Sequence, residues 1–460
     1  MDRTKELEAE SVGSLLLKFS MPAIAGMLVN ALYNVVDRIY IGHMGNGIGS
    51  VALSGLAVTF PISTIIMAFG MLVGIGACSM ISIRLGQKNN EAAEKILGNA
   101  VVLEVIVSVL ISLFGLLFLD KLLVLFGASK EGLPYAKDYI SIILIGAVLQ
   151  NIGFGINNII RAEGNPKMAM LTMVFGAIIN IILDPIFIFT FKLGIQGAAI
   201  ATVIAQAFNT IWVLNYFNGR KSRSILKIKK ENMKLNLEII KNIFSIGMSP
   251  FVMQVASSIV ILLYNKGLYT YGGDTAVAAF GIINSISTLI FMPIFGINQG
   301  AQPIIGYNYG AKSYKRVKEA LKLAMISATV ISFLGFICVQ TFPKVFIRIF
   351  VSGDAKLIDL GAHAIKIDLM FLPIIGFQIV GSNYFQAIGK AKIAMLLSML
   401  RQVAVLIPLI IILPKFFKLE GLWLSQPCSD LFAAILIAVF LYIGIQNLNE
   451  MESEQIKETD

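Results

Sequence analysis

Long apolar stretches recur along the whole chain and limit what it can fold into. A run of about 20 apolar residues is long enough for a helix to cross the hydrocarbon core of a bilayer. Charged residues make up only 14% of the chain, against about a quarter in an average soluble protein. We therefore predict an all-α membrane protein with twelve transmembrane helices. The apolar runs cover roughly residues 15–42, 51–83, 96–118, 137–160, 167–191, 194–216, 243–265, 276–307, 320–342, 364–387, 391–414 and 419–445.

Lysine and arginine are distributed unequally between the two sides of the predicted membrane. With the N-terminus inside, the inner segments carry 23 of them and the outer segments carry 11. Inner loops of membrane proteins are enriched in lysine and arginine, so we expect both termini in the cytoplasm and a multi-pass protein of the cytoplasmic membrane. The basic segment 218–241 is then an inner connection, and the pI of about 9.3 reports orientation and contact with membrane lipid, with no nucleic-acid partner.

The two halves of the chain repeat each other. Five short motifs recur in the same order at offsets of about 222–228 residues, among them "GQKNNEAAEKI" (86–96) with "GAKSYKRVKEA" (310–320). Each half holds six spans, so both halves enter the membrane from the same side. The prediction is two parallel six-helix lobes, with a substrate site between them and alternating access through their rocking. The predicted parts are 1–217 (N-lobe, helices 1–6), 218–242 (basic cytoplasmic linker) and 243–460 (C-lobe, helices 7–12, with a cytoplasmic tail).

Two acidic residues lie inside apolar runs of the first half. Asp37 occurs in "ALYNVVDRIYIG" and Asp184 in "NIILDPIFIF". A charged side chain at the bilayer centre costs roughly 2.5–3.5 kcal/mol on insertion scales, so such a residue normally has a partner or a function. The repeat places the neutral residues Asn265 and Ile407 at the matching positions of the second half. The acids are therefore not required by the fold alone.

Helical spacing groups further oxygen-bearing side chains with these acids. Tyr33 and Asn34 share a face with Asp37, Asn180 lies one turn before Asp184, and Ala198, Thr202 and Gln206 line one face of the sixth span. Carboxylate, amide and hydroxyl oxygens suit a hard cation, or a proton held between carboxylates. Pro185 removes a backbone donor and frees the carbonyl of Ile181, and both Pro22 and Pro185 can bend their helices. The alternative for Asp37 is an ion pair with Arg38 or a lysine at the outer rim.

The substrate cavity is less clear from the sequence. Polar candidates are Asn157, Gln254, Asn284, Arg401 and Gln402. Arg401 and Asp430 lie in apolar runs of the second half and can form a structural ion pair or contact the substrate. Asp368 is a third charged residue in an apolar run of that half.

The motifs "FSMPA", "VVDRIYIG", "RAEGNPKMAM", "NIILDP" and "GAAIAT", in this order, resemble those of the multidrug and toxic compound extrusion (MATE) transporters, in particular the DinF-like and MepA-like branches. The resemblance covers residues 12–445. It implies twelve helices in two lobes, and export of cationic or amphipathic drugs in exchange for Na⁺ or H⁺. It also implies a cation site, holding Na⁺ in a sodium-coupled member, at Asp37, Asn180, Asp184 and Thr202. Spans seven and eight lack the carboxylates that some members use there, which favours coupling in the N-lobe.

Other functions remain as alternatives. A flippase for a lipid-linked saccharide belongs to the same broad superfamily, although such proteins usually have about fourteen spans and several cavity arginines. A membrane enzyme requires a catalytic constellation, whereas the two histidines, His43 and His363, lie near predicted helix ends. A channel needs no duplicated lobes. We expect a monomeric transporter that is not an enzyme and uses no cofactor other than its coupling ion.

Overall fold

The computed structural model describes residues 3–44, 48–218, 224–351 and 354–459, and this part of the chain is almost entirely helical. The α-helices are α1 (Arg3–Ala9), α2 (Val12–Gly42), α3 (Ile48–Gly86), α4 (Asn90–Leu117), α5 (Leu119–Leu125), α6 (Leu133–Ala162), α7 (Pro166–Pro185), α8 (Gly194–Asn218), α9 (Leu237–Gly310), α10 (Tyr314–Thr341), α11 (Pro343–Phe350), α12 (Ala355–Asp368), α13 (Leu372–Ala387), α14 (Ala391–Met399) and α15 (Ile407–Thr459). Two π-helical segments, Ile186–Thr190 and Leu400–Leu406, and one 3₁₀ turn, Lys230–Met233, complete them.

The predicted spans map onto these helices. Nine helical stretches of the described residues are long and apolar enough to cross a membrane, and the pair α12–α13, bent by 48° at its break, makes a tenth. Two of the nine stretches hold two predicted spans each. In α9 the two spans are separated by Gly273 (φ 65°). In the stretch Ala391–Gln455, which runs from α14 into α15, they are separated by Lys418 of α15 (φ 49°). Together with the comparisons reported below, this confirms the predicted twelve-helix membrane fold.

The backbone repeats where the sequence repeats. Residues other than glycine seldom adopt a positive φ, yet lysines do so at matching places in the two halves, and a matching pair of glycines does the same after spans four and ten. The pairs are Lys88 (φ 59°) with Lys312 (φ 58°), Lys192 (φ 56°) with Lys418 (φ 49°), and Gly164 (φ 91°) with Gly389 (φ 77°). Such rare conformations at equivalent positions support an internal duplication.

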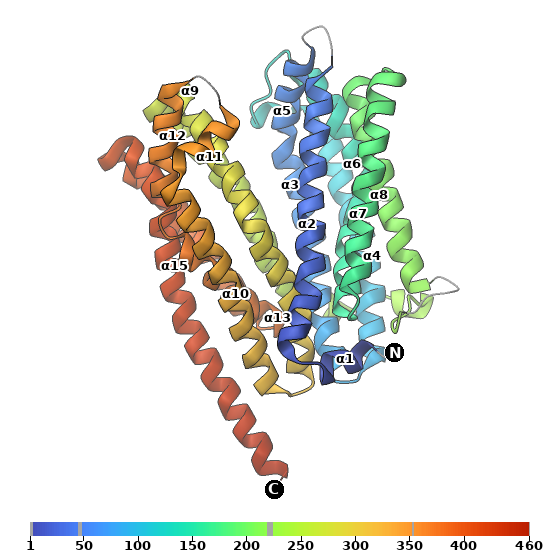
Figure 1. Ribbon diagram of the computed structural model, residues 1–460. Coiled ribbons are helices and arrows are strands. Elements are labelled where there is room, and N and C mark those ends of the chain that lie inside the picture. Colours follow the sequence, from blue (N-terminus) through green and yellow to red (C-terminus); the bar gives the residue numbers. More distant parts are fainter. Residues whose placement is uncertain (1–2, 45–47, 219–223, 352–353, 460) are drawn as a thin grey trace. The chain divides into compact units, whose positions relative to one another are not determined.

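The described helices form two compact units. The first comprises Met1–Ala9 and Ala25–Gln254, and the second comprises Glu10–Ile24 and Val255–Asp460. In the first unit α3 packs against α4 and α6, and α8 packs against α6 and α7 (Figure 1). In the second unit α13 packs against α10 and α15. The start of α2 is thus grouped with the second unit and the start of α9 with the first, whereas the lobes predicted at 1–217 and 243–460 remain a division based on the sequence repeat.

Glycines allow very close helix contacts within the first unit. A Cβ atom on Gly74 of α3 would lie 2.4 Å from the Cα of Gly155 on α6, and a Cβ on Gly247 of α9 would lie 1.8 Å from the carbonyl oxygen of Leu72. Real Cβ atoms do not come so close to a backbone. The three helices can therefore approach one another only because these positions lack side chains.

Replacing Gly74 with alanine is expected to destabilise the first unit, because the methyl group would force α3 and α6 apart. Overpacking of a well-packed interior costs about 1–3 kcal/mol, which should lower the midpoint of thermal unfolding in detergent. Gly281→Ala is the matched control, since a Cβ there meets nothing within 4 Å. Equal midpoints for the two variants would contradict the close contact.

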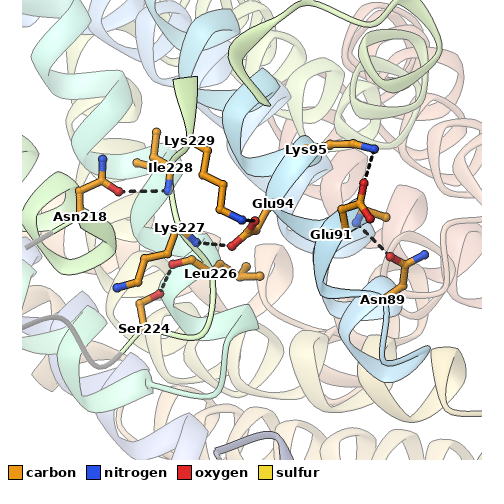
Figure 2. A network of polar contacts seen from close by, with 11 residues as sticks. Asn89, Glu91, Glu94, Lys95, Asn218, Ser224, Leu226, Lys227, Ile228 and Lys229 are labelled. Atoms are coloured by element: carbon orange, nitrogen blue, oxygen red, sulfur yellow. Dashed lines mark hydrogen bonds and ion pairs between the residues drawn. The ribbon is translucent and has the colours of Figure 1, made fainter. Parts of the chain in front are cut away.

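The linker after α8 is fastened to the first unit by carboxylates on α4 and beside α6. Glu94 of α4 accepts from the backbone N–H of Lys227 (3.1 Å) and pairs with the Nζ of Lys229 (2.6 Å), as Figure 2 shows. Glu163, just after α6, accepts from the Ser224 hydroxyl (2.7 Å) and from the backbone N–H of Leu226 (2.9 Å). Burial, the largest effect on this carboxyl, raises the pKa of Glu163 above its ordinary value.

Asn99, one turn beyond Lys95 on α4, extends this attachment. Its amide group donates to the carbonyl oxygens of Asn232 (3.3 Å) and Lys234 (3.2 Å), and its Oδ1 accepts from the backbone N–H of Asn236 (2.8 Å). The described part of the predicted linker is therefore bound to the first unit by side-chain hydrogen bonds and is not a loose connection.

Candidate cation-binding site

Helix α7 carries two of the candidate ligands. It begins after Asn165, whose Oδ1 accepts from the backbone N–H of Met168 (3.3 Å), and Pro166 takes its first position, where a missing N–H costs little. The helix runs to Pro185 and continues as the π-helical segment Ile186–Thr190. Wide π turns within helices often mark functional sites. The π-helical segment here begins two residues after Asp184.

Asn180 links the two helices of the site. Its Nδ2 donates to Oδ1 of Asp184 one turn later (3.1 Å) and lies 3.3 Å from Oγ1 of Thr202 on α8. Asp184 is fully buried and Asn180 is 2% exposed. Oδ2 of Asp184 and Oδ1 of Asn180 are buried and have no hydrogen-bond partner. Two acceptor oxygens of different chemical type are therefore free to bind a cation or a proton.

Asp37 supplies a second carboxylate from α2. It is buried, its Oδ1 has no hydrogen-bond partner, and its charge acts on Asp184. Arg38, by contrast, is exposed, and the described residues contain no ion pair between it and Asp37. The structure thus places Asp37, Asn180, Asp184 and Thr202 in one unit, with Asp37 and Asp184 within electrostatic range of each other.

Sequence reasoning missed Tyr139, which belongs to the same cluster. This tyrosine of α6 lies within interaction range of Thr202, Asp37 and Asp184, and it is also part of the buried apolar cluster of the first unit. Its hydroxyl adds a group that can donate to a carboxylate or accept from water. The only signal in the sequence is a tyrosine in the fourth apolar run, which resembles an ordinary core residue.

The residues predicted to neighbour the site have different surroundings. Tyr33 is half-buried and lies within electrostatic range of Tyr139. The side chain of Asn34 lies outside the described part of the structure. Ala198 is fully buried in the apolar cluster and brings no polar side-chain group. Gln206 contacts another partner, because its Nε2 donates to Oε1 of Gln150 (3.4 Å).

The polar cavity candidates are divided between the two units. Asn157 is buried in the first unit and donates to the carbonyl oxygen of Ala169 (3.3 Å), and Gln254 is half-buried there. In the second unit Asn284 is exposed, and Gln402 donates to the Ser257 hydroxyl (3.4 Å). These four residues do not form one cluster within either unit. Pro22 lies inside α2 within the segment grouped with the second unit.

The second unit holds a separate group of charges. Nε of Arg401 lies 3.3 Å from Oδ1 of Asp430, and Gln426 donates to both oxygens of that carboxylate (3.1 Å each). Asp368, at the end of α12 before the 48° bend, is buried and within electrostatic range of Asp430. The predicted ion pair between Arg401 and Asp430 is therefore present, and Arg401 belongs to the π-helical segment Leu400–Leu406.

Comparisons with known proteins agree along the whole chain. The family model MatE matches residues 22–186 and 247–412, one copy in each half. The multidrug export protein MepA of Staphylococcus haemolyticus is 28% identical over 453 residues, which covers 98% of each chain. The MATE multidrug transporter DinF-BH, solved as a complex with a ligand, is 40% identical with a TM-score of 0.88, covering 94% of this chain and 96% of its own. A MOP superfamily transporter from Pyrococcus furiosus is 27% identical with a TM-score of 0.89, covering 96% and 98%.

Proposed function

The chain belongs to the MatE family, and from this premise we propose that it is a cation-coupled antiporter that exports cationic or amphipathic drugs by alternating access. It is a multi-pass membrane protein whose relatives are named as multidrug exporters. We assign it to the cytoplasmic membrane with both termini in the cytoplasm, from the distribution of lysine and arginine. It acts as a monomer, because one chain contains both repeats.

The buried oxygen cluster of the first unit carries this proposal. A buried acceptor without a partner is costly, and here three such oxygens, on Asp37, Asn180 and Asp184, occur in one unit. Carboxylate and amide oxygens are ligands for hard cations, and two neighbouring carboxylates can also share a proton. The cluster therefore has the chemistry of a coupling site for Na⁺ or H⁺, with Thr202 as a further oxygen.

Coupling requires that the ion binds one conformation better than the other, because a ligand shifts an equilibrium only by its differential affinity. Asp184 is the last residue but one of α7, just before the π-helical segment, and Pro185 lacks the N–H that would hold the turn before it. Neutralisation of Asp184 by an ion changes the charge balance at this weak point of α7. Binding and release of the ion then move the end of α7 and alternate the access of the drug.

The test is efflux of ethidium from preloaded right-side-out membrane vesicles, with gradients of Na⁺ and H⁺ imposed separately. We expect a Na⁺ gradient to drive efflux, because Na⁺ needs several oxygen ligands and Asn180 and Thr202 add two uncharged ones. Binding of a proton would not require them. A response to the proton gradient alone would keep the exporter and reassign the ion.

Efflux that saturates and stops when an ionophore collapses the gradient supports an antiporter and excludes a channel. Absence of efflux under both gradients would refute the proposal as stated. Lipid-linked saccharides would then be the next substrates to test, since a flippase of the same superfamily is the alternative.

A further inference from the structure

A further buried carboxyl group of the first unit lies on α4, a helix that carries none of the residues of the candidate cation site. Glu104 is the fifteenth residue of the 28-residue helix α4, and its side chain is fully buried. Both carboxyl oxygens are inaccessible and have no hydrogen-bond partner. An ionised carboxylate in such a place costs far more than a neutral one. Glu104 is easily overlooked in the sequence, because the run 96–118 around it is apolar.

The space for this carboxyl group is made by glycine. A Cβ on Gly155 of α6 would lie 2.0 Å from Oε1 of Glu104, so any other residue at position 155 would collide with the acid. The same Cβ would lie 3.4 Å from the carbonyl oxygen of Gly70 on α3. The acid therefore points into a seam where α3, α4 and α6 meet, since α4 packs against both other helices.

One turn further along, the seam has a second polar layer. Nδ2 of Asn151 on α6 donates to Oγ of Ser108 on α4 (2.9 Å), and both residues are fully buried. Oδ1 of Asn151 has no hydrogen-bond partner. A neutral carboxylic acid has one O–H to donate, so the seam contains both a potential donor and a free acceptor one helical turn apart.

No charged group faces the acid within the described part of this seam. On the α3 and α6 sides the seam is formed by glycine backbone and Asn151, none of which titrates. The nearest titratable groups along these helices are Cys78 on α3 and Arg161 on α6, which lie four and six residues beyond Gly74 and Gly155. On α4 itself the nearest basic residue is Lys95, nine positions before Glu104. Both oxygens of Glu104 lack a partner among the described residues, so only the neutral acid is compatible with the closed seam.

We propose that Glu104 is a proton-binding site of the first unit, distinct from the site of Asp37 and Asp184. The closed seam of α3, α4 and α6 holds the protonated acid. When the seam opens, the O–H bond breaks, the proton passes to water, and the carboxylate is hydrated. Rising pH therefore favours the open seam, and protonation closes it. This site exists whether or not the chain exports drugs, so its test does not depend on the proposed function.

The first measurement is infrared spectroscopy of the purified protein at neutral pH. The carbonyl stretch of a neutral carboxylic acid should be present in the wild type and in Glu94→Gln, and its Glu104 component should be missing from Glu104→Gln. Glu94 is the matched control because it lies on the same helix but pairs with Lys229. Identical carbonyl regions in wild type and Glu104→Gln would show that Glu104 is ionised and would overturn the proposal.

The second measurement follows the seam itself. Spin labels at Leu110 of α4 and Ile145 of α6, both exposed, report the separation of the two helices in a cysteine-free background. In the wild type, a second population with a longer distance between the labels should increase as the pH rises. This population should be absent from Glu104→Gln, which mimics the neutral acid. Glu104→Leu, of similar shape, should behave like Glu104→Gln and serves if the glutamine variant folds poorly. A distance that is independent of pH in the wild type, or equally dependent in all variants, would refute coupling of the proton to the seam.

Discussion

Replacing Asp184 with asparagine is expected to reduce drug efflux to the level of vesicles without the protein. The substitution preserves shape, and the amide of Asn180 can still donate to the Oδ1 at position 184, as it does now at 3.1 Å. It removes the charge that a coupling ion neutralises. Moving a two-state equilibrium from one side to the other takes a differential affinity of about 10⁴-fold, which an uncharged amide oxygen does not supply. The measurement is ethidium efflux under the gradient that drives the wild type.

Asp120→Asn is the matched control for this experiment. Asp120 is an exposed acid of the same unit that pairs with Lys137 at 2.9 Å, and exposed pairs contribute only about 0–1 kcal/mol. This variant should transport like the wild type. A thermal melt gives a readout independent of transport, because Na⁺ should stabilise the wild type and Asp120→Asn but not Asp184→Asn. Normal efflux by Asp184→Asn would remove the coupling role from this residue.

Replacing Asp430 with asparagine is expected to destabilise the second unit severely. Asp430 is 1% exposed, and its carboxylate is the counter-ion of Arg401. Removal of one partner from a fully buried ion pair costs about 3–5 kcal/mol. The side chain of Arg401 is 19% exposed, so we expect a loss of about 3 kcal/mol, at the lower end of that range. Gln426 can still donate to the new amide oxygen, so the loss arises from the charge. The measurement is the midpoint of thermal unfolding, together with the yield of monodisperse protein.

The double variant Arg401→Gln/Asp430→Asn separates a structural pair from a substrate contact. Removing both charges should restore most of the stability, since neither member of the pair is then left as an unpaired charge. Asp368→Asn should then have a smaller effect, because the structure shows no ion pair for this acid among the described residues. If Asp430→Asn melts like the wild type but loses ethidium efflux, the residue contacts the substrate and the structural interpretation is wrong.

Glu104 and Asp184 show that a single acid in an apolar run is recognised in a sequence only when a local pattern accompanies it. Both are single acids in apolar runs. Asp184 was found because Asn180 precedes it by one helical turn and Pro185 follows it, whereas Glu104 has only apolar neighbours and Ser108. An acid that lies against glycine backbone from other helices leaves no local pattern. Tyr139 was missed for a related reason, because its role depends on acids from α2 and α7.

The linker, too, could be predicted only in part from the sequence. Its basic composition predicted an inner connection, but not that Glu94, Asn99 and Glu163 fasten it to the first unit. These contacts join residues more than 60 positions apart, and their partners are mostly backbone N–H groups. Backbone groups are the same in every residue, so no sequence pattern identifies them.

The sequence by itself determined the twelve apolar spans, the internal duplication and the oxygen-bearing residues of the candidate site. Hydropathy and helical spacing are local properties, and an unbroken span of about 20 apolar residues has the length with which a helix crosses lipid. Only the tertiary structure decided which of these residues meet. The approach of Asp37 to Asp184, the pairing of Arg401 with Asp430, and the burial of Glu104 against Gly155 depend on how separate helices pack. That packing is set by side-chain volume between residues far apart in the chain, which one-dimensional patterns do not record.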